Sequence, residues 1–239
     1  MCDVRDIGPV RRCPTVSAMT EEQTGDGLAW IGQHAGDARG AGDGVAGMRG
    51  SISLTAVRGA DPVDFLVRMG ADRDVLERGV LYKDIAARWS GEEYKDWQCM
   101  FGTSGEWTFL LEDYLCATWY LDWIEEVEGA MPRRGEELVC VTLNQHQAPS
   151  RLVYSPGDGE VWCMGIGEDS LLDHPGRADP TGKVAALDEA LRQAGVEWRG
   201  DDLVPRVFHT VGEHLGIRLP RHEIEAGLLP AAALPDPTQ

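Results

Sequence analysis

The 239 residues carry 40 Asp and Glu against 22 Lys and Arg, a formal net charge of −18, and 43% of them are hydrophobic. Binding to the phosphates of DNA or RNA needs a basic surface, so this charge excludes nucleic acid from the predicted partners. No apolar run reaches about 18 residues, so neither a transmembrane helix nor a membrane partner is predicted. The start, MCDVRDIGPVRRCPTV, lacks the apolar centre of a signal peptide, and the six cysteines form no CxxC pair, so a cytoplasmic protein with free thiols is expected.

Residues 1–50 are expected to form a flexible leader, because they hold ten of the 29 glycines and few large apolar residues. One island, DGLAWIGQH, interrupts this composition and predicts a short helix near residues 26–34. Its apolar residues would dock this helix on the domain that follows. The first residue of the protein is left open between Met1 and Met19, since TEEQTGDGLAWI follows Met19.

The domain begins with SISLTAVRG, whose alternating β-branched residues predict a strand over residues 51–59. A helix is predicted over residues 61–70, with Asp61 as its N-cap and Pro62 at its first position. WQCMF and EWTFLLE, on either side of GTSG, then predict a β-hairpin over residues 97–112.

The second half of the domain continues with a predicted helix over residues 115–128, whose apolar residues recur at i, i+4 and i+8. EELVCVTLN predicts a strand over residues 136–144, and SRLVYSPGDGEVWCMGIG predicts a second hairpin. Two helices follow, over residues 179–196 and 202–215, and the second has the clearest helical periodicity in the chain. Residues 230–239 are expected to be a disordered tail.

The order of these elements predicts an α+β fold. Neighbouring strands are joined by short turns and not by regular helical crossovers, which is typical of antiparallel sheets. We therefore expect a single domain over residues 51–229, with a mainly antiparallel sheet of about five strands and helices packed mostly on one face.

Three stretches, SLTAVRGADPVDFLVRMGA, EWTFLLEDYLCATW and LVCVTLNQHQAPSRLVYSPGDGEVWCMGIG, together with LVPRVFHTVGEHLGIRL, resemble an uncharacterised bacterial family. This family is the domain of unknown function numbered 6461, which is frequent in high-GC soil bacteria. The similar stretches span residues 51–217, and GLAWI also looks like the short first helix of that family. The resemblance implies no activity and carries over no catalytic residue.

The acidic pair Glu112–Asp113, which follows the first hairpin among aromatic residues, is one candidate site. Consecutive residues on a strand point to opposite faces, so the two carboxylates converge only if the strand ends at Glu112. A catalytic pair would also need two different environments that separate its pKa values. The alternative is that Asp113 caps the next element while Glu112 is solvated.

Asn144 and His146 leave a predicted core strand in the loop NQHQ, and functional residues lie in such loops more often than in core elements. The alternative is an ordinary hydrogen-bonded turn. No metal and no cofactor are predicted, because His209 and His214 are five residues apart and miss the i, i+4 spacing of zinc ligands on a helix. The chain also has no Walker loop and no G-x-S-x-G elbow.

Tryptophan side chains recur on the apolar faces of the predicted elements, which favours a place in the core. The alternative is that they line a ligand pocket. The five residues concerned are Trp97, Trp107, Trp119, Trp123 and Trp162.

Acidic residues are concentrated over residues 91–137, where 12 acids accompany three bases and the net charge of −9 is half that of the chain. Asp122, Glu125 and Glu126 lie along one side of the predicted helix. Such a surface is either spread over solvent or kept for a basic partner. Since no catalytic motif is present, we expect a non-catalytic protein-binding domain of an accessory or immunity-like kind.

The alternative function is a small-molecule-binding protein or an enzyme, with a site near Glu112, Asp113 and His146 beside the tryptophans. The sequence leaves the oligomeric state open. The predicted binding residues are Glu112, Asp113, Asp122, Glu125, Glu126, Asn144 and His146.

Overall fold

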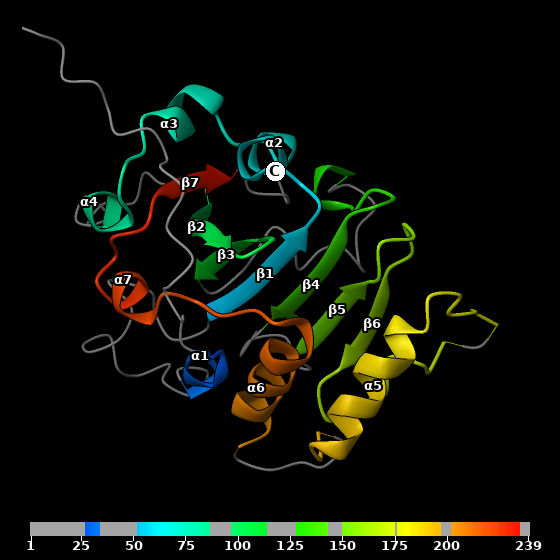
Figure 1. Cartoon of the computed structure of the whole chain (residues 1–239). Helices are drawn as coiled ribbons and strands as arrows, with labels where there is room; N and C mark the ends of the chain where they lie inside the picture. The colour runs from blue at the N-terminus through cyan, green and yellow to red at the C-terminus, as the bar shows by residue number, and fades with distance from the viewer. Residues whose placement is uncertain are drawn as a thin grey trace, which may run out of the picture.

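The computed structural model describes residues 27–33, 52–86, 97–113, 128–142, 150–174, 176–196 and 202–234. Seven strands in these residues form one sheet in which every neighbouring pair is antiparallel (Figure 1). The order across the sheet is β6-β5-β4-β1-β3-β2-β7. The strands are β1 (Ile52–Arg58), β2 (Trp97–Ser104), β3 (Trp107–Asp113), β4 (Glu137–Thr142), β5 (Arg151–Ser155), β6 (Trp162–Gly165) and β7 (Ala231–Leu234).

The predicted α+β fold with a mainly antiparallel sheet is confirmed, but the prediction of about five strands is wrong, because the sheet has seven. One of the additional strands comes from the tail that was expected to be disordered. Strand β7 pairs with β2 over the register Trp97↔Leu234 to Met100↔Ala231. Ala231 and Leu234 are buried, so the folded domain continues past residue 229.

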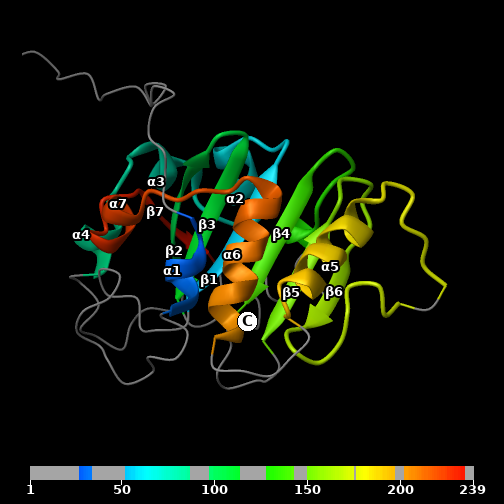
Figure 2. The ribbon, with the colours of Figure 1, turned by 60° about the horizontal axis from the view of Figure 1, so that its bottom comes forward.

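Helices cover both faces of the sheet (Figure 2). The prediction of helices mostly on one face therefore misses the helices on the second face. The helices on the first face are α1 (Ala29–Gln33), α5 (Lys183–Gln193), α6 (Leu203–Leu215) and α7 (Arg221–Glu225). Those on the second face are α2 (Pro62–Arg68) and α3 (Arg73–Glu77), with the 3-10 turn η3 (Glu128–Ala130) beside α2, while α4 (Tyr82–Ala86) lies near the β7 edge.

Strand β1 runs through the middle of the sheet and is buried on both sides. Leu54 and Ala56 belong to the larger apolar core, under α1, α5 and α6, whereas Val57 belongs to the smaller core under α2. This alternation follows from the two-residue period of a strand. Because both faces of β1 are covered, a slip of its register by one residue would exchange the two cores.

Helix α2 begins as the sequence predicts. The carboxylate of Asp61 accepts hydrogen bonds from the backbone N–H groups of Val63 and Asp64, both at 3.0 Å. Pro62 occupies the first turn, where a helix has no use for a backbone donor. These contacts fix the point at which the chain leaves β1 and turns onto the second face of the sheet.

The predicted short helix of the leader is present as α1 and docks on α6. Leu28 and Ile31 are fully buried in the larger core. Gly212 of α6 makes this docking possible, because a Cβ atom there would lie 2.8 Å from Cγ of Leu28. Helix α1 is therefore a part of the domain core, and the boundary expected at residue 51 excludes it wrongly.

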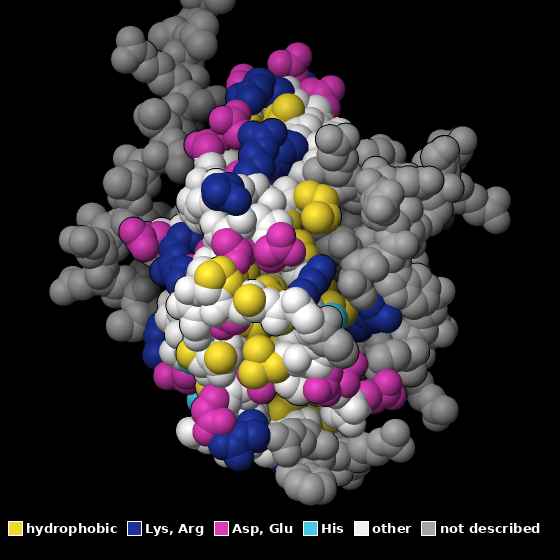
Figure 3. All heavy atoms as spheres, turned by 90° about the vertical axis from the view of Figure 1, so that its right-hand side faces the viewer, with side chains coloured by type: hydrophobic (Ala, Val, Ile, Leu, Met, Phe, Trp, Pro, Cys, Tyr) yellow, Lys and Arg dark blue, Asp and Glu magenta, His cyan; other side chains and the backbone are white. Residues whose placement is uncertain are grey.

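The described surface has few large exposed hydrophobic side chains. Met131, Leu172 and Leu228 stand out, and they belong to separate parts of the fold. On the side of the molecule that carries α5, hydrophobic side chains reach the surface in small groups among charged ones (Figure 3). None of the helices in the described ranges is long and apolar enough to cross a membrane.

Candidate functional site

Two of the seven predicted binding residues, Glu112 and Asp113, lie in the described part of the chain, and the other five lie outside it. Glu112 lies in β3 and is only 1% exposed, so the alternative in which it is solvated is wrong. Asp113 is the last residue of β3 and pairs with Ile52. The remaining five lie outside the described residues, and their roles stay predictions. These are Asp122, Glu125, Glu126, Asn144 and His146.

Glu112 belongs to a row of polar residues on the second face of the sheet. In the strand register it lies between Cys99 of β2 and Ser53 of β1. Continuing the β1–β4 register by one residue places Thr142 beside Ser53, and Thr142 pairs in turn with Arg151 of β5. We call Ser53, Cys99, Glu112 and Thr142, all almost fully buried, the polar row.

The polar row crosses β2, β3, β1 and β4 at one end of the sheet, where β1 begins. Strands β3 and β4 run antiparallel to β1, which lies between them. Both therefore end at the end of the sheet where β1 begins. Asn144 and His146 follow β4 in the sequence but lie outside the described residues, so a site that joins them to Glu112 stays a prediction.

The chemistry of the polar row is not that of an activated nucleophile. Burial, and next the charge of Glu112, raise the pKa of the Cys99 thiol well above its usual value. A thiol is nucleophilic only as the thiolate, so Cys99 is held in its unreactive form. The side chain of Asp113 lies outside the described part of the structure, so the predicted pairing of its carboxylate with that of Glu112 stays a prediction.

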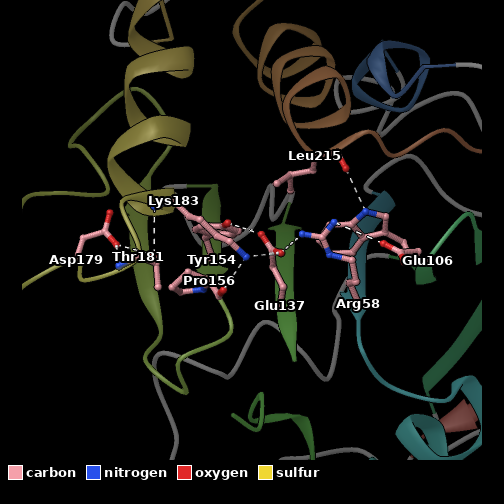
Figure 4. Close-up of polar contacts among 10 residues, drawn as sticks. Arg58, Glu106, Glu137, Tyr154, Pro156, Asp179, Thr181, Lys183 and Leu215 are labelled. Atoms are coloured by element: carbon pink, nitrogen blue, oxygen red, sulfur yellow. Dashed lines mark hydrogen bonds and ion pairs between the residues drawn. The ribbon is translucent and has the colours of Figure 1, made fainter. Parts of the chain in front are cut away.

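A second polar cluster surrounds Glu137 at the opposite end of the sheet (Figure 4). The hydroxyl of Tyr154 donates to Oε1 of Glu137 at 2.5 Å. Arg58 of β1 donates to Oε2, and the Lys183 ammonium at the start of α5 donates to the same oxygen at 3.0 Å. Lys183 also reaches the carbonyl oxygen of Pro156 at 3.1 Å. We call Arg58, Glu137, Tyr154 and Lys183 the Glu137 cluster.

Arg58 ties this cluster to the rest of the fold. Its guanidinium carbon lies 4.9 Å from the centroid of a Trp107 ring, a distance typical of a cation–π contact. The indole N–H of Trp107 donates to the carbonyl oxygen of Leu215, at the end of α6, at 3.1 Å. Glu106, on the exposed turn of the first hairpin, lies 3.9 Å from Arg58. Through Trp107 of β3, the cluster therefore connects the four strands β1, β3, β4 and β5 with α5 and α6.

The electrostatics of the Glu137 cluster favour a permanent ion pair. Burial alone would raise the pKa of Glu137, but the hydrogen bonds from Tyr154, Arg58 and Lys183 outweigh burial and lower this pKa. Burial and the same carboxylate raise the pKa of Tyr154. Glu137 thus stays ionised and Tyr154 stays protonated. The hydrogen bonds join β1, β4, β5 and α5, so the cluster contributes to the stability of the fold.

Glu136, next to Glu137, makes an equally complete pair on the second face. Arg68 of α2 binds both of its carboxylate oxygens, each at 2.8 Å, and the backbone N–H of Arg133 donates to it at 2.8 Å. Arg68 also donates from Nε to the carbonyl oxygen of Gly129 in η3. Burial opposes ionisation of Glu136, but these donors prevail and lower its pKa.

The two glutamates correct the predicted acidic surface over residues 91–137. Glu112, Glu136 and Glu137 were counted in that surface, but each is at most 8% exposed. The sequence gives a weak sign of this, since EELVCVTLN puts both glutamates at the start of a wholly buried strand. The sequence does not indicate which residues pair with Glu137, because the partners are far away in the chain. Arg58, Tyr154 and Lys183 lie 79, 17 and 46 residues from it.

The tryptophans of the described chain belong to the core. Trp107 and Trp162 are 3% and 2% exposed and pack in the larger apolar core, which confirms the core interpretation for these two. Trp97 is in β2 but its side chain is not described, and Trp119 and Trp123 lie outside the described residues. Within the described ranges, no three His, Cys, Asp or Glu side chains are grouped so that they could hold a metal ion.

Comparison with known proteins found no family model, no curated protein and no solved structure that matches this chain. The resemblance to the bacterial family described above therefore stays a prediction. The functional interpretation rests on the geometry and charge of the chain itself.

Proposed function

We propose that this chain is a non-catalytic protein-binding domain, of an accessory or immunity-like kind, whose acidic segment meets a basic partner. The acidic segment is residues 113–128, between the end of β3 and the start of η3. It carries five acids, Asp113, Asp122, Glu125, Glu126 and Glu128, and no Lys or Arg. This uncompensated charge is the observation that carries the proposal.

The contrast with the neighbouring acids supports this interpretation. Glu136 and Glu137 are buried and have basic partners of their own in the domain. These ion pairs neutralise the two carboxylates inside the fold, so neither carboxylate contributes to an acidic binding surface. The acidic segment contains no base within its own sequence, which favours a basic partner for its charge.

The attachment of the acidic segment also suits a binding role. Asp113 is held in the ladder opposite Ile52, and η3 is held by Arg68 at the carbonyl oxygen of Gly129. Gly129 lies so close to α2 that an added Cβ would be 1.9 Å from the carbonyl oxygen of Arg68. The segment is thus fixed at both ends to the sheet and α2. A segment held at both ends loses less freedom when a partner binds than a free tail would.

Complementary charge would give such a contact its speed and orientation. An acidic surface attracts a basic protein over about 8 to 10 Å at physiological ionic strength, so it accelerates encounter and selects against acidic proteins. The segment also contains Trp and Tyr, which are enriched at the energetic centres of interfaces.

A pull-down from a lysate of the native host tests the proposal. The full-length chain is compared with Glu125→Lys/Glu126→Lys at low and at high salt, and captured proteins are identified by mass. A matched control is Asp84→Lys/Glu168→Lys, which changes the net charge equally at two exposed acids elsewhere. We expect a basic protein that the native chain and the control capture, and that the segment variant loses. Equal capture by all three chains, or no salt-sensitive partner, would remove the basis of the proposal.

The buried polar row favours a second candidate, a small polar ligand bound near Glu112. The observation is that Oγ of Ser53 is fully buried and has no hydrogen-bond partner among the described residues. An unpaired buried hydroxyl costs roughly 1 to 3 kcal/mol, which a bound polar molecule would recover. A thermal-shift screen of metabolites tests this idea. A ligand that stabilises the native chain but not Ser53→Ala would support it, and a ligand that stabilises both equally would speak against this site.

A further inference from the structure

The sheet has two edges, and they are protected in different ways. At the β7 edge, the backbone N–H of Ala231 donates to the carbonyl oxygen of Val80 at 2.8 Å, so another part of the backbone covers it. At the β6 edge most of the covering groups are side chains, and the backbone N–H groups of Glu168 and Asp169 cover only the carbonyl oxygen of Gly165, at 3.0 and 3.3 Å. An exposed edge strand offers unpaired backbone donors and acceptors to any second strand, so this difference matters for association.

The register of β6 shows which backbone groups face the edge. Ile166 donates its N–H to the carbonyl oxygen of Ser150 at 2.8 Å, so Ile166 faces β5. In an antiparallel pair the direction alternates, so Met164 and Trp162 also face β5. The three residues between and beside them, Val161, Cys163 and Gly165, therefore direct their N–H and C=O groups outward.

Each of these three outward residues is bound by a side chain from the chain that follows β6. Asp169 accepts from the N–H of Gly165, and Arg177 donates to the carbonyl oxygen of Val161. Nε2 of His174 lies 2.9 Å from the carbonyl oxygen of Cys163 and 3.4 Å from its nitrogen. In either tautomer this ring nitrogen occupies one of the two groups.

The segment that supplies these side chains is firmly attached. We call residues 166–174 together with Arg177 the edge strap. Its residue Leu171 is fully buried in the larger core, and Asp188 of α5 accepts from the N–H of Leu171 at 2.9 Å and from the hydroxyl of Ser170 at 2.7 Å.

Trp162 holds two of the three blocking side chains in place. The guanidinium of Arg177 lies 5.6 Å from a Trp162 ring centroid, and the His174 ring stands edge-on to it at 5.7 Å. The positions of the blocking groups are therefore set by packing as well as by the hydrogen bonds that they make.

We propose that the edge strap is a guard that prevents β6 from pairing with β6 of a second copy of this chain. A second copy is the expected partner because the outward backbone groups of β6 are arranged symmetrically about Cys163. Two β6 strands placed antiparallel about Cys163 would pair residue 163 with its own copy and residue 161 with residue 165. Because the carbonyl oxygen of Gly165 already accepts from the backbone of Glu168, the pairing gives up to about four hydrogen bonds across a two-fold axis, which is a self-complementary interface.

The same geometry limits the assembly to two copies. After β6 pairs with β6, each copy presents only its β7 edge, where Val80 already binds Ala231. The side of the molecule around α5 adds no broad hydrophobic surface that would drive other contacts (Figure 3). Loss of the guard should therefore give a closed dimer and not a fibre.

The test is the mass in solution of the full chain with Asp169→Ala, His174→Ala and Arg177→Ala combined. Light scattering coupled to gel filtration, and sedimentation equilibrium, are run from about 5 to 200 μM. The expected result is a rise with concentration from the native mass to twice that value. Adding Gly165→Pro removes one outward N–H from the edge, as proline does on natural edge strands, and should restore the native mass. The control Glu168→Ala/Leu172→Ala changes exposed strap side chains and leaves the backbone contact of Glu168 with Gly165 intact, so it should keep the native mass.

Three results would overturn the proposal. They are a folded triple variant that keeps the native mass throughout, a doubled mass that survives Gly165→Pro, and a polydisperse aggregate of folded chains. If circular dichroism shows that the triple variant does not fold, His174→Gln/Arg177→Gln, which leaves Asp169 and its contact intact, is judged by the same three outcomes.

Discussion

At the scale of single residues, the charged groups of this protein divide into those that serve the fold and those left for the outside. Glu137 is charged, almost fully buried and yet stable, because three donors converge on its two oxygens. A buried carboxylate is costly unless its hydrogen bonds are complete, and here they are. The same principle explains the Arg68–Glu136 pair. These residues therefore predict stability effects and not catalytic ones.

Glu137→Ala should destabilise the fold by roughly 2 to 4 kcal/mol, because it removes one partner from a buried network and leaves Tyr154 and Arg58 without their acceptor. Urea unfolding followed by fluorescence measures the change. Glu189→Ala is the control, since Glu189 pairs with Arg192 at the exposed surface of α5, where solvent screens the pair, and its loss should change the stability little. Equal effects of the two substitutions would contradict a special role of Glu137.

Stability should also fall with acid in a way that depends on Glu136 and Glu137. The pKa of each is lowered in the folded protein, so the unfolded chain binds more protons than the folded one as the pH drops. The stabilisation by these groups is therefore complete above their unfolded pKa of about 4.5 and is lost as the pH falls through the folded value. Urea midpoints from pH 7 to pH 3 test this. The Glu137→Gln variant should lose less stability over that range than the native chain, and a parallel decline would count against the assignment.

At the scale of the elements, short pieces far apart in the chain complete the domain. Helix α1 fills the space beside Gly212 of α6, and β7 closes the sheet along β2. A five-residue helix and a four-residue strand are not stable alone, so tertiary packing stabilises both.

Leu28→Ala should therefore cost roughly 2 to 4 kcal/mol, as expected for a fully buried leucine. Deletion of residues 1–24 should leave the melting temperature unchanged, because α1 and its buried residues are retained. Thermal unfolding of both variants by calorimetry checks the pair of expectations. A drop of several degrees for the deletion would show that the leader contributes to the fold.

Gly129→Ala should detach η3 from α2, because the added methyl group cannot fit 1.9 Å from the carbonyl oxygen of Arg68. The expected loss of stability is roughly 2 to 3 kcal/mol, measured by urea unfolding. Gly27→Ala is the matched control, since its nearest atom would be an ordinary 3.9 Å away. If both alanines had the same effect, the close approach of η3 to α2 would have no energetic importance.

At the scale of the whole molecule, the sequence predicted the elements that carry their own signal. The capped start of α2, both hairpins and the apolar stripe of α6 follow from local patterns. Strand β7 was missed because Ala-Ala-Ala-Leu after a proline has little strand propensity. Its pairing with β2 depends on partners 131 to 137 residues away, from Met100↔Ala231 to Trp97↔Leu234. The Glu137 cluster was missed for the same reason, since its partners meet only in the folded chain.

The candidate site was predicted only in outline. Glu112 was chosen for its place at the end of an aromatic strand, and it lies near the end of β3, with β1 between β3 and β4. Its burial could not be foreseen, because it depends on the cover over the second face of the sheet, which a strand pattern does not encode. The charge of the acidic segment, in contrast, is a property of the sequence itself.

The central claim, that the acidic segment binds a basic protein, is tested most directly by the affinity of the captured partner as a function of salt. Titration calorimetry compares the native chain with Glu125→Lys/Glu126→Lys at about 0.05 and 0.5 M salt. The account predicts that the substitutions weaken binding at least about tenfold at low salt and much less at high salt. The reason is that salt screens the electrostatic attraction to the basic partner, which the two lysines turn into repulsion. An affinity that is the same for both chains at low salt would contradict the claim.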